Sequence, residues 1–568
     1  MLYFIITWTC LTIVLFLLGI NLLRICKADC FDRRGDRALA AIWLGIVGVA
    51  LLWLAVSLVL PLSPLIGWGV AIALAVLSLF SQQTRREIVA YKSIISPRSI
   101  LVFLSLQLLV AILTTQQIVW FDTGLYHLGS IQWLSKFGAV YGVALINPKF
   151  GFTSSWFAFS APLIPDFVGN RVGAIANGFV FLIAVIHWII TLTRLLKNQA
   201  RLPDWFYFVY AGILIGVYFV TTFTGSPILI SFSPDVSVNF LIGVIAWTIL
   251  FIYQIKSVSI NSICHRIIPL LVACGTVAIK LSALPLLPAT LLFYSGVKPV
   301  KFQRLFWGIA LIILLLLPVN LVAIKTAACP LYPSKFMCLD LPWSVPAEST
   351  KEEAGEIQFL GELAQEKSGI LQVILAYWKL LDDNEFKIII LLLALSLIFS
   401  GLIIKNSSGE KWLILIGILG MTFIITQSPL LRFGIGYFIV IPSLFIAEVG
   451  QIQLSKIQPL INQKQLRVQL RRSEKIVPLV LLFIAGTIAV QNDVKSRWLL
   501  PADLPTAQVI KRKVNDVQYA YPRNWTVKCW KYPLPCAHVP VHNVKLRDPE
   551  RGIGGGFVNT KSGQKYLD

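Results

Sequence analysis

The residues best suited to chemistry stand together in the string Trp120-Phe-Asp-Thr-Gly-Leu-Tyr-His127. Asp122 is a carboxylate that can accept a proton, and Tyr126 and His127 follow it by about one helical turn. Apolar residues recur every three positions from 125 to 137, which predicts an amphipathic helix in the plane of a membrane interface. Two plainer interpretations stay open: Asp122 caps this helix, and His127 is an interfacial polar residue.

These residues must be positioned by a membrane protein, because the composition leaves little alternative. Hydrophobic residues make up 57% of the chain, charged residues 13%, and the mean hydropathy is +0.77. A soluble fold has no interior large enough for so much apolar surface, whereas lipid accepts it. The net charge of +22 fits cationic loops that contact anionic headgroups. We find no nucleic-acid-binding motif and predict no nucleic-acid partner.

Apolar runs of roughly 18–22 residues, long enough to cross ~30 Å of hydrocarbon, recur along the chain. We therefore predict an all-α polytopic membrane protein with about 14 transmembrane helices. The first run lacks a basic start and a cleavage site, so we interpret it as a retained helix. The segment 267–297, which turns near Lys280, is alternatively one broken helix. The predicted spans are 2–23, 39–60, 62–80, 99–119, 172–193, 204–223, 235–254, 267–282, 284–297, 305–325, 386–404, 412–427, 433–449 and 476–490.

Lys and Arg residues indicate the orientation of these spans. They gather in 24–38, 81–98 and 450–475, whereas the loops 224–234 and 427–432 hold one between them, Arg432. Cationic loops stay in the cytoplasm, so we predict both termini on the outer, periplasmic side of a bacterial inner membrane. The chain then divides into membrane helices at 1–119, 172–325 and 386–490, two outer loops at 120–171 and 326–385, and a small outer cap at 491–568. We expect juxtamembrane helices in the first outer loop.

The cysteines agree with this orientation. Cys329 and Cys338 fall in one outer segment, and Cys529 and Cys536 fall in another. Each pair is close enough in sequence for a local disulfide in an oxidising compartment. A zinc site is the alternative for these four residues, although neither CxxC spacing nor a His pair supports it.

The motif around Asp122 resembles part of a known superfamily. An outer-face Asp after a membrane helix, followed by two juxtamembrane helices, is similar to the first large loop of the GT-C glycosyltransferases. The string 122–127 and the downstream Gly151-Phe-Thr-Ser-Ser-Trp-Phe157 resemble an uncharacterised group of GT-C-like bacterial membrane proteins. The same pattern is found in Cys329-Pro-Leu-Tyr-Pro333, Leu341-Pro-Trp343 and Pro429-Leu-Leu-Arg-Phe433.

The resemblance implies a GT-C-like bundle that transfers a sugar from a polyprenyl-phosphate donor to a glycan, lipid or protein acceptor. Asp122 would be the general base for the acceptor hydroxyl, with Tyr126 and His127 beside the substrate. A lipid phosphate is already a good leaving group, so we expect neither a metal nor another cofactor.

A cation near that phosphate would stabilise its charge as the bond breaks. Arg432 is the first candidate because a guanidinium matches phosphate geometry, although it alternatively anchors to a headgroup. Lys280 is the second, because charge within a span is expensive and usually functional. If a hairpin turn lies there, Lys280 instead snorkels to the interface.

Four further residues are candidates with simple alternatives. Asp235 follows Ser233-Pro234, a helix-start signal, so it is interpreted first as an N-cap. Asp340 lies beside a predicted disulfide and is a candidate for contact with an acceptor. Trp343 and Trp156 are suited to stacking on sugar faces, but Trp is also enriched at membrane interfaces.

Other functions remain open from the sequence. A lipid-linked carbohydrate transporter or flippase requires polar residues along the whole depth of the bundle, whereas an enzyme requires them at its outer mouth. The predicted spans contain few polar residues, mainly Lys280, His187 and the pair Gln116-Gln117, which favours the enzyme. A polysaccharide polymerase or ligase that uses a lipid carrier is a further alternative.

Overall fold

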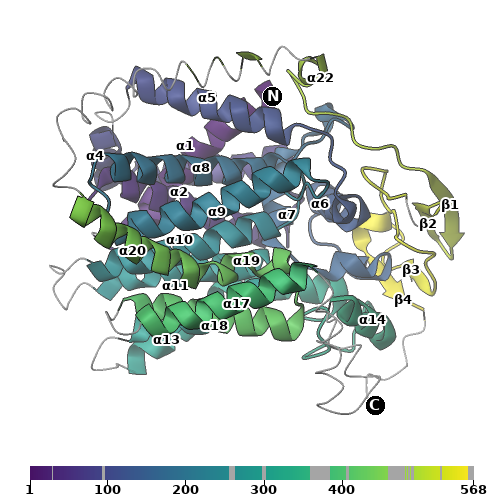
Figure 1. Ribbon diagram of the computed structural model, residues 1–568. Helices are drawn as coiled ribbons and strands as arrows, with labels where there is room; N and C mark the ends of the chain where they lie inside the picture. Colours follow the sequence, from purple (N-terminus) through teal and green to yellow (C-terminus); the bar gives the residue numbers. More distant parts are fainter. Residues whose placement is uncertain are drawn as a thin grey trace.

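The computed structural model describes residues 1–28, 30–91, 96–254, 263–296, 302–357, 384–403, 409–457, 480, 483, 486–487, 492–524 and 527–560. Long apolar helices form a bundle, and one end of it carries short helices and a small β-structure (Figure 1). We call residues 492–560 the cap, and the end of the bundle that it covers the cap end. The opposite end is called the far end.

Ten of the described helices are long and apolar enough to cross a membrane, so the chain is a membrane protein. They are α1 (Leu2–Ile25), α2 (Arg34–Val56), α5 (Pro97–Thr114), α8 (Ile175–Leu196), α9 (Leu202–Phe223), α10 (Asp235–Gln254), α13 (Phe302–Ala327), α17 (Asn384–Ile403), α18 (Glu410–Gln427), and α19 (Leu431–Phe438) continued by α20 (Val440–Ile457).

Three of the remaining predicted spans do not form single long helices. The span at 62–80 becomes α3 (Pro64–Leu79), which meets α4 (Gln82–Tyr91) at a bend of 96°. The two helices together are a broken span or a re-entrant loop. The spans at 267–282 and 284–297 become the shorter α11 (Ile267–Ile279) and α12 (Leu286–Ser295).

The short helices α11 and α12 pack against each other, so this segment is a hairpin. Lys280 ends α11 with an extended backbone, and the 3-10 turn η7 (Leu281–Ala283) follows it. The last predicted span, at 476–490, falls mostly outside the described residues.

The first two helices pack closely because two glycines lie at their contact. A Cβ atom on Gly19 would lie 1.8 Å from the carbonyl oxygen of Ala41, and one on Gly45 would lie 2.3 Å from that of Leu15. Only a residue without a side chain allows two backbones to approach this closely. Both glycines therefore set the distance between α1 and α2.

Short helices cover the cap end, as predicted for the first outer loop. Ser130 and Gln132 of α6 (Leu128–Phe137) are nevertheless buried together with most of its apolar stripe, which differs from the predicted interfacial helix, while Lys136 is exposed. The cap causes this burial, since Gln132 donates a hydrogen bond to the carbonyl of Lys531. The other short helices of this end are η1 (Thr123–His127), η2 (Val143–Leu145), η3 (Pro148–Gly151), α7 (Ser155–Ser160), η4 (Ala161–Leu163), η5 (Asp166–Val168) and α14 (Ala347–Ile357), while η6 (Ile263–Arg266) precedes α11 at the far end.

The cap contains strands that the all-α prediction did not include. Strands β1 (Val509–Val514) and β2 (Val517–Pro522) form one antiparallel pair, in which Val514 pairs with Val517 across a tight turn. Strands β3 (Val544–Leu546) and β4 (Phe557–Asn559) form another. The short helices α22 (Asn492–Lys495) and η9 (Gly552–Gly555) complete the cap.

The N-terminus is attached to the start of the cap. The Met1 ammonium donates to the carbonyl of Arg497 at 2.6 Å, and the backbone N–H of Leu2 donates to that of Trp498 at 2.8 Å. The N-terminus and the cap therefore lie at the same end of the bundle.

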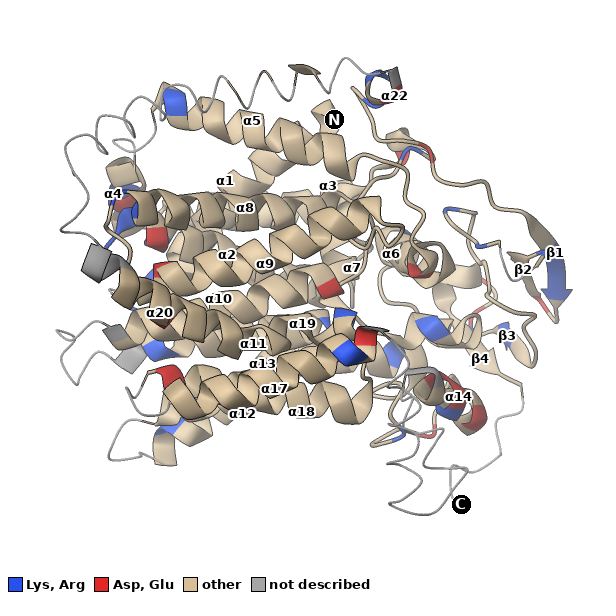
Figure 2. Cartoon of the chain, viewed as in Figure 1, with Lys and Arg blue, Asp and Glu red and all other residues tan. Residues whose placement is uncertain are grey.

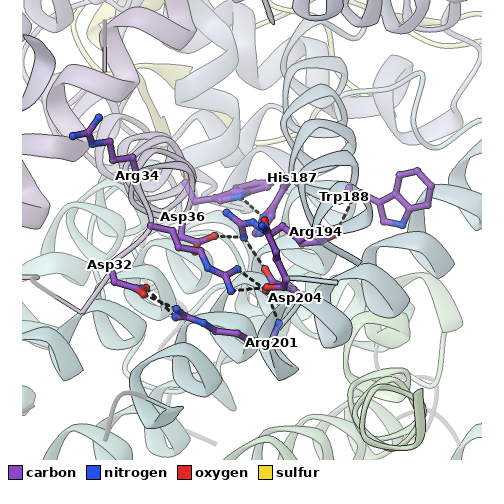
Figure 3. A network of polar contacts seen from close by, with 12 residues as sticks. Asp32, Arg34, Asp36, His187, Trp188, Arg194, Arg201 and Asp204 are labelled. Carbon is purple, nitrogen blue, oxygen red and sulfur yellow. Dashed lines mark hydrogen bonds and ion pairs between the residues drawn. The ribbon is translucent and has the colours of Figure 1, made fainter. Parts of the chain in front are cut away.

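Charged residues lie mainly toward the two ends of the bundle, and the middles of the helices are almost free of them among the residues described (Figure 2). At the far end a buried network joins α2, α8 and α9 (Figure 3). Asp204 accepts hydrogen bonds from Arg33 at 2.7 Å, from Arg194 at 2.6 Å and from the backbone of Arg201 at 2.8 Å. Arg194 also pairs with Asp36. Because these side chains come from three helices, the network fixes the far end.

We expect the change Asp204→Ala to destabilise the protein by roughly 3 kcal/mol or more, because it leaves buried arginine charges uncompensated. Asp32→Ala is the matched control, since Asp32 pairs with Arg201 at an exposed site and should cost less than about 1 kcal/mol. Thermal unfolding of the purified protein in one detergent measures both changes. Equal melting temperatures for the two variants would show that the network does not hold the far end together.

Candidate functional site

Asp122 lies at the start of a helix but does not cap it. Its backbone is helical, with φ −63° and ψ −27°, and its side chain accepts no hydrogen bond from the first turn. The interpretation of Asp122 as an N-cap is therefore wrong. The following residues form the π-helical turn η1, a rare geometry that is often found at functional sites. This turn leaves the Asp122 carboxylate available for a distant partner.

That partner is Arg432 at the start of α19, 310 positions away in the sequence. Its guanidinium donates to Oδ2 of Asp122 at 3.2 Å. The Asp122 side chain is 26% exposed and that of Arg432 is 36% exposed, so solvent reaches the pair. The guanidinium carbon also lies 4.7 Å from the ring centre of Phe433 and 5.5 Å from that of Trp120.

A second ion pair, between Lys280 and Asp235, contacts the same phenylalanine. Lys280 Nζ lies 3.6 Å from the ring centre of Phe433 and pairs with Oδ1 of Asp235. The other Asp235 oxygen accepts from the Ser233 hydroxyl at 3.0 Å. Asp235 begins α10, as predicted, but its side chain is committed to Lys280 and is only 4% exposed. Lys280 is thus held in an ion pair and does not merely extend toward the interface.

A buried asparagine positions the segment that carries Arg432. Asn239 of α10 donates to the carbonyl of Arg432 at 3.1 Å and accepts from the backbone N–H of Gly436 at 3.1 Å. It thereby fixes the first turn of α19 against α10, the helix that also carries Asp235. We did not predict a role for Asn239 from the sequence. The sequence feature that could have indicated this role is an amide side chain one helical turn after Asp235, inside an otherwise apolar run.

His127 lies beside the ion pairs but beneath the surface, and Tyr126 next to it is partly buried. His127 is 1% exposed, its Nδ1 lies 3.3 Å from the Thr123 hydroxyl, and its ring packs on Phe157. Burial lowers the pKa of His127 to about 4, although the charges of Asp122 and Asp235 act in the opposite direction. Burial likewise raises the pKa of Tyr126. Both rings are therefore neutral near pH 7.

Three other candidate residues make their contacts elsewhere. Trp343 donates to the carbonyl of Ile324 at 2.9 Å and packs edge-on against Tyr141. Trp156 is fully buried and donates to Asn177, so it is neither an interface residue nor accessible to a sugar. Asp340 is exposed. Among the described residues, the hydrogen bonds and ring contacts of these three side chains involve neither ion pair.

Both predicted cysteine pairs form disulfides, Cys329–Cys338 and Cys529–Cys536. Within the described ranges no group of three or more His, Cys, Asp or Glu side chains is arranged to hold a metal ion. The cap end thus offers two carboxylates and two cations around Phe433, with the more accessible pair formed by Asp122 and Arg432.

The lowered pKa of His127 predicts a stability loss in mild acid. The unfolded chain binds this proton near pH 6.5 and the folded protein only near pH 4, so stability falls as the pH decreases between these values. At pH 5 the loss from this residue should be about 2 kcal/mol relative to pH 7.5. His127→Asn should lose correspondingly less stability over the same range, measured by thermal unfolding at both values. His542→Asn, a change at an exposed cap residue, should behave as the unmodified protein does.

The chain was also compared with known proteins. Neither the curated proteins nor the solved structures include a significant match to it. A family model described as "Domain of unknown function (DUF8201)" matches residues 1–439, which include η1, Asp235, Lys280 and Arg432. The match covers most of the chain, and the protein therefore belongs to this family, Domain of unknown function (DUF8201).

Proposed function

We propose that the protein is a glycosyltransferase that moves a sugar from a polyprenyl-phosphate donor to an acceptor hydroxyl. The cap end would face the outside of a bacterial inner membrane, with both termini on that side. The resemblance of the Asp122 motif to GT-C glycosyltransferases supports this proposal, as does the concentration of lysine and arginine in the loops 24–38 and 81–98 of the far end.

The observation that carries the proposal is the state of the Asp122 carboxylate. Its Oδ2 is held by Arg432, while its Oδ1 receives no hydrogen bond from the described residues. A carboxylate with one oxygen oriented by a cation and the other free can accept a proton from a bound hydroxyl. The partial exposure of the pair lets an acceptor reach that oxygen.

The chemical step uses both partners of this pair. Oδ1 of Asp122 takes the proton of the acceptor hydroxyl, and the hydroxyl oxygen bonds to the anomeric carbon of the donor sugar. The bond from that carbon to the phosphate oxygen breaks, and its electron pair leaves with the lipid phosphate. Protonation of Asp122 weakens its attraction to Arg432, so the guanidinium charge becomes available to stabilise the phosphate.

Lys280 has a supporting role in this scheme. Asp235 neutralises its charge, and its ammonium packs closely on Phe433, so Lys280 is less free than Arg432 to move toward a phosphate. The Lys280–Asp235 pair fixes the aromatic ring against which the Arg432 guanidinium packs. We therefore assign phosphate binding to Arg432 first.

A transporter or flippase is the alternative from another class. Its substrate would need polar groups along the depth of the bundle, whereas the described charged residues lie mainly toward the two ends (Figure 2). The interior amide of Asn177 is already bound by Trp156 and the carbonyl of Ser233. These observations favour chemistry at the cap end. A polymerase or ligase would use the same lipid carrier and differ in its acceptor.

We expect Asp122→Asn to lower the rate of sugar transfer by at least 100-fold, because the amide cannot accept the proton. Arg432→Gln should slow transfer less severely, and Arg432→Lys should restore part of the rate because it keeps the charge. The measurement is carrier-dependent release of sugar by purified protein from a panel of polyprenyl-phosphate sugars.

Asp166→Asn is the matched control, because Asp166 is an exposed aspartate of the same segment in η5. It should retain the unmodified rate. Turnover that survives in Asp122→Asn would contradict Asp122 as the base and would direct attention to Asp340 or Asp235. Absence of turnover with every donor, together with movement of a lipid-linked sugar across vesicles, would support the transporter.

A further inference from the structure

A disulfide-closed loop of the cap lies directly on the helix that carries Asp122. The Cys529–Cys536 disulfide closes this loop, which we call the latch and define as residues 528–536. Two backbone hydrogen bonds fix its base to β2: Ala520 N–H donates to the carbonyl of Pro535 at 3.0 Å, and Ala537 N–H donates to that of Ala520 at 2.8 Å. The latch is therefore anchored to the cap at one side.

Its other side contacts η1. The backbone N–H of Trp530 donates to the carbonyl of Gly124 at 3.1 Å. A Cβ atom on Gly124 would lie 2.8 Å from the Trp530 ring and 2.9 Å from Cβ of Lys528, so only glycine permits this approach. Lys528 Nζ lies 3.9 Å from the ring centre of Phe121, the residue before Asp122. The latch thus touches the helix on both sides of the Asp122 position.

Trp530 is held in an unusual conformation to make this contact. Its φ is +46°, in the left-handed region that non-glycine residues rarely adopt. Trp530 is 9% exposed and packs with the core of the helical bundle, as Val494 and Leu504 do, whereas the buried residues of the cap strands and the Cys529–Cys536 disulfide belong to separate clusters. A backbone strain of this kind persists only where the surrounding structure enforces it, and it is concentrated at functional sites.

We propose that Trp530 is a positioning residue, which the Cys529–Cys536 disulfide holds against η1 so that Asp122 meets Arg432. The positioning of η1 follows from the contacts alone, while its consequence for catalysis rests on the proposed function. Because the disulfide closes the latch, the arrangement of the site depends on an oxidising compartment. Reduction releases one side of the latch and lets η1 move away from α19.

The first test is hydrogen–deuterium exchange of the full-length protein in lipid nanodiscs, followed by mass spectrometry of peptides that cover 121–127. Trp530→Ala should increase the exchange rate of these amides by about 10-fold or more, because it removes the packing that covers the turn. Trp530→Phe should restore most of the protection. Tyr521→Ala is the matched control: it removes a cap aromatic that packs on Tyr519 and Arg512, and it should leave these peptides unchanged.

The second test removes the covalent closure. The double variant Cys529→Ser/Cys536→Ser, or reduction of the unmodified protein, should raise exchange in 121–127 while α8 and α10 stay protected. The double variant Cys329→Ser/Cys338→Ser removes the other disulfide and should leave exchange in 121–127 unchanged. If Trp530→Ala also exposes α8 and α10, it has unfolded the protein, and the Cys529/Cys536 variant then decides the matter. Unchanged protection at 121–127 in that variant would overturn the proposal.

Kinetic measurements distinguish the positioning role of Trp530 from the proposed glycosyltransferase activity. In an active protein, Trp530→Ala should lower kcat by about 10-fold or more with little change in KM for the donor, and Trp530→Phe should recover most of it. A lowered kcat with unchanged exchange would place Trp530 elsewhere in the mechanism and would overturn its positioning role. Faster exchange in a protein that transfers no sugar would support the latch and refute the proposed function.

Discussion

The cap end is organised by two ion pairs that share one aromatic ring. An apolar bundle cannot leave charge uncompensated, so each cation is held beside a carboxylate and over the face of Phe433. The partners come from η1, α10, the end of α11 and the start of α19. Their pairing therefore fixes four separate elements relative to one another, and the site exists only when all four are in place.

The ion pairs at the two ends of the bundle differ in burial, and this difference separates stability from function. At the far end, Asp204 is almost completely buried and shared by three donors, so its loss leaves the largely buried Arg194 with less compensation. The Asp122–Arg432 pair is about one-quarter to one-third exposed and contributes little to stability. A weak, accessible pair can open to admit a substrate, which a buried network cannot do.

The cap positions further elements of the cap end, by packing contacts instead of ion pairs. It covers α6, so Gln132 and Trp133 are buried where a membrane interface was expected. Through Trp530 it also presses on η1, next to Asp122. The DUF8201 match ends at residue 439 and does not include the cap. The helices that supply the ion pairs thus belong to the family segment, while one of their supports comes from outside it.

Sequence alone determined the features that depend on local composition. Hydropathy placed most spans within a few residues of the helices observed, because an apolar run of about 20 residues has few other stable states in lipid. It also located Asp122, Arg432 and Lys280, since charge next to an apolar run is conspicuous. Only the tertiary structure decided that Asp122 pairs with Arg432 and Lys280 with Asp235, that Asn239 fixes α19, and that Trp530 lies on Gly124. Those contacts join positions up to about 400 residues apart, and no local pattern encodes which helix faces which, because packing selects the neighbours.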